Sequence, residues 1–121
     1  MDTRRLIGLL FVFCSPLAIA NPLNNQSDEQ LFKNFALSSC IAEYYKGSEV
    51  AKDALTAMQG YREFSNLPLD LFFDVYELLK SNNMSDYRAK DGRTIKLAYC
   101  IDFSNSERLL SLYNAAQEPE L

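Results

Sequence analysis

The chain has 121 residues, of which 48% are hydrophobic and 23% are charged, and its formal net charge at pH 7 is −4. This composition is typical of one globular domain. The negative balance, without any block of basic residues, argues against binding to nucleic acid or to an anionic membrane surface. Because the chain contains no His, it cannot by itself form a Ser-His-Asp triad, a Cys-His pair or a His-ligated metal site.

Residues 1–20 have the three parts of a secretory signal peptide. Two arginines supply basic charge, an apolar run occupies 6–13, and the Ala-Ile-Ala sequence at 18–20 has the small-x-small pattern that signal peptidase requires. Cleavage after residue 20 leaves a mature chain of 21–121 with 10 basic and 15 acidic residues, a formal charge of −5. We therefore expect an exported protein with no membrane segment after cleavage.

Two other interpretations of this segment remain, an uncleaved membrane anchor and a lipid-modified Cys14. The apolar stretch 6–19 contains Pro16 and is shorter than the ~20 residues that a membrane-spanning helix needs. Bulky Phe13 stands where lipid modification of Cys14 requires a small residue. Both observations favour cleavage.

Cleavage also leaves two cysteines, Cys40 and Cys100, in a chain exported to an oxidising compartment. Two cysteines allow one pairing. A disulfide between them closes a loop of about 61 residues, to which the chain-entropy model attributes about 4 kcal/mol of stability. The alternative is a pair of buried free thiols.

The start of the mature chain, 21–26, is polar, and we expect it to be loosely structured. Ser27 then begins the first predicted helix as the N-cap of a capping box with Gln30. Gly47 ends that helix, because glycine readily adopts the left-handed conformation. Ser48 directly after it is the predicted N-cap of a second helix.

A third predicted helix, 69–80, is the most apolar segment of the mature chain, and its apolar residues fall on more than one face. Either it lies centrally or part of its surface meets another chain. A fourth helix is predicted over 94–101 with Thr94 as its cap. A break at 102–105 separates it from a fifth helix over 106–116.

No segment alternates apolar and polar residues for long enough to predict a strand. The sequence therefore predicts a single small all-α domain of about five helices over 21–121. The predicted disulfide, Cys40–Cys100, joins helix 1 to helix 4.

The acidic residues of the third helix, Asp70, Asp74 and Glu77, recur at i, i+4 and i+7 and share one face. They fit a contact patch for a cationic partner, a weak calcium site or simply a solvated face. No oxygen-rich calcium loop accompanies them. A hydrolase that uses Asp70 and Asp74 is a further hypothesis, but no convergent polar motif supports it. We expect no enzyme activity, no cofactor and no metal site.

The longest polar stretch, 81–93, exceeds the usual helix-to-helix connection. It contains Tyr87 and Arg88, residue types that are enriched at binding hot spots. The two interpretations of this loop are a binding surface and a mobile linker without contacts.

Three sequence motifs in this order resemble those of the type VI secretion amidase-immunity proteins. They are LFKNFALSSCIA at 31–42, LAYCID at 97–102 and LLSLY at 109–113, in an exported helical domain. The resemblance implies a small all-α periplasmic protein with one disulfide, usually a homodimer. Such proteins inhibit a papain-like cysteine amidase that cuts the peptide stem of peptidoglycan, and they thereby protect the producing bacterium and its kin.

The resemblance also implies roles for particular residues. Cys40 and Cys100 match the disulfide of the family, the loop 81–93 is the segment that plugs the active-site groove of the amidase, and the third helix of the other subunit assists. The expected partner contacts are Tyr87, Arg88, Lys90 and Asp91 from the loop and Asp70 and Asp74 from the helix. The alternative function is a small disulfide-bonded periplasmic chaperone, which binds many clients and no single tight partner.

Overall fold

Five α-helices make up most of the structure, a computed structural model that describes residues 22–119. The predicted signal peptide lies outside the described residues. The elements in chain order are the short 3₁₀ helix η2 (Pro22–Asn25), α1 (Asp28–Tyr44), α2 (Glu49–Glu63), α3 (Leu69–Ser81), α4 (Lys96–Ser104) and α5 (Glu107–Gln117). The described part of the chain contains no strand beyond one isolated β-bridge, so the all-α prediction is confirmed. Only two residues separate α4 from α5, so the pair can also be counted as one bent helix.

Serine side chains begin three of the helices, because each hydroxyl accepts a backbone N–H that has no partner within its helix. Ser27, Ser48 and Ser106 Oγ accept from the N–H groups three residues further on, at 3.1, 3.2 and 3.2 Å. Gly47 has a φ of +86° in the turn after α1, which ends at Tyr44 with Tyr45 as its C-cap. The predicted starts of α1, α2 and α5 are therefore confirmed, and Gly47 has the predicted left-handed conformation, but α1 ends before Gly47 is reached.

The segment 22–25 differs from the loose leader that its polarity predicts, since it forms η2. Its Leu23 packs on α2 at Gly60, where an added Cβ atom would lie 2.9 Å from Leu23 Cδ1. The absence of a side chain at Gly60 therefore gives Leu23 a place to pack, and this apolar contact explains the order of the segment.

The bounds of α4 also differ from the prediction. Its N-cap is Ile95, which makes no side-chain capping hydrogen bond, so Thr94 does not cap it. The helix continues through the predicted break to Ser104. Phe103 and Ser104 are buried. Their burial stabilises the last turn of α4, although the sequence of these residues alone suggests a break.

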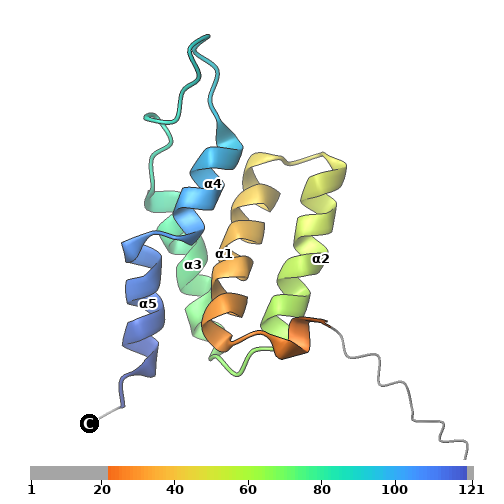
Figure 1. Ribbon diagram of the computed structural model, residues 1–121, viewed down its shortest axis with the longest axis vertical. Coiled ribbons are helices and arrows are strands. Elements are labelled where there is room, and N and C mark those ends of the chain that lie inside the picture. Colours follow the sequence, from red (N-terminus) through yellow and green to blue (C-terminus); the bar gives the residue numbers. More distant parts are fainter. Residues whose placement is uncertain (1–21, 120–121) are drawn as a thin grey trace, which may run out of the picture.

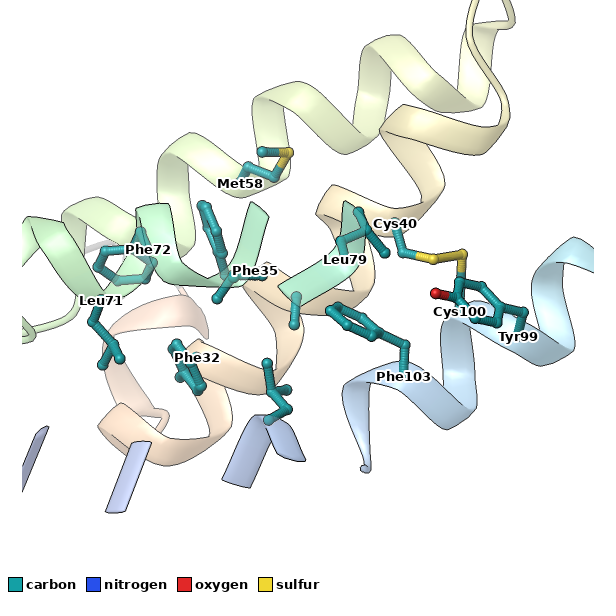
Figure 2. Packing of buried hydrophobic residues seen from close by; sticks show 13 residues of the cluster. Phe32, Phe35, Cys40, Met58, Leu71, Phe72, Leu79, Tyr99, Cys100 and Phe103 are labelled. Atoms are coloured by element: carbon teal, nitrogen blue, oxygen red, sulfur yellow. A yellow bond between two sulfur atoms is a disulfide. The ribbon is translucent and has the colours of Figure 1, made fainter. Parts of the chain in front are cut away.

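Helix α1 occupies the centre of the domain and contacts each of the other four α-helices (Figure 1). Its Phe32 and Phe35 are fully buried. Phe35 meets Phe72 of α3 edge-on with ring centroids 4.6 Å apart, and Phe32 lies 5.9 Å from the ring of Tyr113 on α5. Figure 2 shows the rings of Phe32, Phe35 and Phe72 in the shared core. The first helix, not the apolar third one, is therefore central.

Helix α3 buries one face and leaves other apolar side chains at the surface. Leu71, Phe72, Val75 and Leu79 are buried in the core, whereas Leu69 and Phe73 are 53% and 55% exposed. Of the two interpretations of this apolar helix, the structure thus favours the one in which part of its surface is available to another chain.

The predicted disulfide is present between Cys40 of α1 and Cys100 of α4, with a Cα–Cα distance of 5.4 Å (Figure 2). Both cysteines are 0% exposed. The bond therefore ties the central helix to a helix of only nine residues, which is too short to be stable by itself.

We predict that Cys40→Ala with Cys100→Ala lowers the free energy of unfolding by about 4 kcal/mol, because the bond restricts a loop with a sequence separation of 60 in the unfolded chain. Urea denaturation of residues 21–121 measures the change. Reductant should destabilise the wild type and leave the double variant unaffected, and an unchanged denaturation midpoint in the variant would contradict the prediction.

Candidate functional site

The connection between α3 and α4 projects beyond the helices at one end of the molecule (Figure 1). Its outer part is a short hairpin over 88–94, in which Arg88 and Thr94 form an antiparallel bridge. The Ala89 N–H donates to the Arg93 carbonyl at 2.8 Å, and the Gly92 N–H donates to the Ala89 carbonyl at 2.9 Å. The predicted exposed loop is therefore an ordered turn and not a linker without contacts.

The tip of the hairpin is built around Gly92, whose φ is +86°. A tight turn followed by a residue in this left-handed conformation is a common three-residue hairpin connection. Asp91 Oδ1 accepts the Arg93 N–H at 3.0 Å, and Arg88 Nη1 donates to the Gly92 carbonyl at 3.1 Å. These bonds define the shape of the tip while Arg88, Lys90 and Asp91 stay exposed to solvent.

The segment that carries the hairpin is basic, although the chain as a whole is acidic. Residues 82–96 include four cationic side chains and two carboxylates. The cations are Arg88, Lys90, Arg93 and Lys96. Lys96 Nζ lies 5.6 Å from the centroid of the Tyr45 ring, within the range of a cation–π contact. A partner that receives the hairpin therefore meets a basic tip.

Tyr87 lies at the base of the hairpin and faces its own chain. Its hydroxyl donates to Asp102 Oδ2 on α4 at 2.8 Å, and its ring centroid lies 5.3 Å from that of Tyr99 at an interplanar angle of 84°. The hydrogen bond to Asp102 is the largest cause of a raised pKa at Tyr87, with burial and nearby carboxylates adding to it. The structure thus separates Tyr87 from the exposed residues Arg88, Lys90 and Asp91, with which the sequence analysis grouped it.

Tyr99 connects the base of the hairpin to the core. It is 3% exposed, and its ring meets those of Tyr44 and Tyr87 edge-on (Figure 2 shows it beside the disulfide). Among the buried side-chain polar atoms of 22–119, only its hydroxyl lacks a hydrogen bond of good geometry, although the side chains of Tyr44 and Asn82 interact with it. Burial raises the pKa of Tyr99 to about 12, Tyr44 adds to the increase, and Asn82 opposes it.

The two predicted helix contacts, Asp70 and Asp74, lie on the first half of α3, at the opposite end of the molecule from the hairpin (Figure 1). They line a surface hollow of about 440 Å³ between α3 and α5. Its apolar lining comes from Leu71, Leu112, Ala115, Ala116 and Pro68, and Glu118 adds a third carboxylate. Within one chain, the predicted partner contacts of the loop and those of α3 are therefore far apart.

The acidic face of α3 does not form a cation site. Glu77 is paired with Lys80 at 3.6 Å. Across residues 22–119, no group of three or more His, Cys, Asp or Glu side chains is arranged to hold a metal ion. Within 22–119, no helix has the length and apolarity needed to cross a membrane.

Asp102 belongs to the site but lies outside the predicted loop, and Arg93 lies inside that loop but was not among the expected contacts. An Asp-Gly pair such as Asp91-Gly92 is typical of a hairpin turn, so the polar arms on either side of it could have predicted a hairpin that includes Arg93. Asp102 is 15 residues from Tyr87 in the sequence. Hydrophobic periodicity predicts contacts within a helix, so it could not predict this contact between a loop and a helix.

We predict that Tyr99→Phe leaves the free energy of unfolding at pH 7 within about 1 kcal/mol of wild type, since the buried hydroxyl that it removes forms no hydrogen bond of good geometry. The native pKa of about 12 lies above the ordinary value of 10.0. The protonated Tyr99 hydroxyl therefore makes its full contribution to the free energy of unfolding below pH 10, and this contribution is lost as the pH rises toward 12.

Denaturant unfolding of both proteins at pH 7 and across this alkaline window provides the measurement. The variant should lose less stability than wild type between pH 10 and pH 12. A large loss of stability at pH 7 would show that the hydroxyl forms a strong hydrogen bond, and an unchanged alkaline decline would show that the native pKa of Tyr99 is not raised.

A family model described as Tai4, type VI secretion system (T6SS) amidase immunity protein, matches residues 30–113. No curated protein matches the chain. The family match covers well over half of the chain and includes all five α-helices in whole or part. The chain therefore belongs to the family of T6SS amidase immunity proteins.

Proposed function

We propose that this T6SS amidase immunity protein is exported to the periplasm, where it binds a peptidoglycan amidase and inserts the hairpin 88–94 into the active-site groove. The amidase is expected to be a papain-like cysteine hydrolase. The observation that supports this role most strongly is the hairpin itself. It combines an internally hydrogen-bonded tip with exposed charged side chains, and it projects from a disulfide-linked bundle.

Inhibition of this kind requires no chemistry from the immunity protein. A segment that fills the groove keeps the peptide stem of peptidoglycan away from the catalytic Cys–His pair of the amidase. Affinity depends on how little conformational freedom is lost on binding. The hydrogen bonds at Ala89, Gly92 and Arg93 restrict the tip before any partner arrives, so the hairpin is well suited to this task.

The hairpin alone is too small for a stable interface, which usually buries on the order of 1,600 Å² in total. Leu97 and Ile101 on α4, close to the hairpin in sequence, are 49% and 45% exposed. These apolar side chains can extend the contact from the hairpin onto α4 at the rim of the groove.

We also propose that the chain binds the amidase as a homodimer. The hairpin and the hollow lined by Asp70 and Asp74 lie at opposite ends of one chain (Figure 1). If both surfaces contact one amidase groove, they come from different subunits. The exposed Leu69 and Phe73 beside these carboxylates supply the apolar surface that such a contact requires.

Calorimetric titration of oxidised residues 21–121 into a T6SS peptidoglycan amidase from the same bacterium tests the function, with peptidoglycan hydrolysis measured in parallel. Saturable nanomolar binding that abolishes hydrolysis supports the proposal. Absence of binding with intact hydrolysis contradicts it for that amidase, and suppression of the aggregation of unrelated clients would then favour the chaperone hypothesis.

We predict that Arg88→Ala with Lys90→Ala weakens binding to the amidase by at least about 2 kcal/mol, because an arginine at the centre of an interface is an expected hot spot and Lys90 is exposed beside it on the same hairpin. The matched control is Lys46→Ala with Lys52→Ala. It removes two exposed lysines, from the turn after α1 and from α2, that form surface ion pairs, and affinity should stay near wild type. Equal effects of both double variants would exclude the hairpin as the main contact.

A further inference from the structure

The backbone and side chain of Tyr87 are both engaged within the chain. Its N–H donates to the Met84 carbonyl at 2.9 Å, and its carbonyl accepts the Ile95 N–H at 2.9 Å, which closes the base of the hairpin. The ring packs on Tyr99, and the hydroxyl bonds to Asp102. Because the backbone, the ring and the hydroxyl of Tyr87 all have partners within the chain, few of its groups remain to bind another protein.

Both side-chain contacts of Tyr87 are made to α4. Tyr99 and Asp102 are three residues apart on that helix and therefore lie on neighbouring turns. Cys100, between them in sequence, bonds α4 to the central helix α1. A continuous set of contacts thus connects the hairpin through Tyr87 and α4 to the most buried helix of the domain.

We propose that the hydrogen bond from the Tyr87 hydroxyl to the Asp102 carboxylate is a latch that fixes the direction of the hairpin and thereby sets its affinity for the amidase. Tyr87 and Asp102 are positioning residues in this account and not contacts of the partner. The effect on affinity rests on the proposed function, whereas the effect on hairpin order concerns the free protein alone.

The geometry at the base of the hairpin explains why the hydrogen bond, and not the ring contact, fixes the direction of the hairpin. The ring of Tyr87 meets that of Tyr99 at 84°, and an edge-on ring contact can tilt without losing its area. A hydroxyl bonded to a carboxylate is directional and stronger than a neutral hydrogen bond. Without it, the hairpin can take several directions, and the amidase must select the one that fits.

A double-mutant cycle with Tyr87→Phe and Asp102→Ala separates positioning from contact. Asp102 is exposed, so neither substitution leaves a buried cavity. We expect each single variant to weaken amidase binding about 3- to 10-fold, the usual range for one such bond. The double variant should be no weaker than the weaker single variant, because the same bond is lost in all three.

The matched control is Asp102→Asn, which removes the charge but keeps an oxygen that accepts from the Tyr87 hydroxyl. Its affinity should lie nearer to wild type than that of Asp102→Ala. If the two effects in the cycle multiply, or if Asp102→Asn is as weak as Asp102→Ala, the hydroxyl or the charge acts on the amidase directly and the latch is overturned.

Amide hydrogen exchange of the free protein supplies the second readout. Tyr87→Phe should accelerate exchange at Ile95 and Ala89, whose N–H groups bond within the hairpin, while the buried residues of α1 stay unchanged. Unaltered exchange at both sites overturns the latch. If wild type does not bind the amidase, the proposed function fails, and this measurement still decides whether the latch exists.

Discussion

The covalent link between Cys40 and Cys100 is the constraint on which the rest of the structure depends. Helix α1 contacts every other α-helix. The disulfide therefore fixes α4 to the most constrained helix of the core. Helix α4 has nine residues and could not stay helical by its own hydrogen bonds. The disulfide holds it in place, and α4 in turn carries the hairpin, the exposed Leu97 and Ile101, and the Asp102 that binds Tyr87.

The distribution of charge and apolar surface gives the domain two distinct ends. The hairpin end carries the cations of 82–96, whereas the start of α3 and the end of α5 carry carboxylates around the hollow at Asp70 and Asp74. An inhibitor that uses both ends on one target must present them from two subunits. The separation of these two surfaces and the exposed side chains of Leu69 and Phe73 are the observations behind the homodimer proposal.

The helices could be predicted because their signals are local. Ser27, Ser48 and Ser106 each cap a helix whose apolar residues recur every three or four positions. The disulfide could be predicted because the expected signal cleavage leaves only two cysteines. The hairpin depends instead on pairing across a turn, and the Tyr87–Asp102 bond depends on where two elements meet in space. Burial of Phe103 likewise extends α4 beyond its predicted end. Local helix propensity does not predict this extension, because it does not indicate which residues become buried.

The most direct test of the central claim is hydrogen exchange of both proteins in the complex of oxidised 21–121 with the amidase. The account predicts new protection at 88–95 in this chain and around the catalytic cysteine of the amidase, with α2 unchanged. Protection confined to α2, or protection of the amidase only at a distance from its active-site groove, would contradict inhibition by the hairpin.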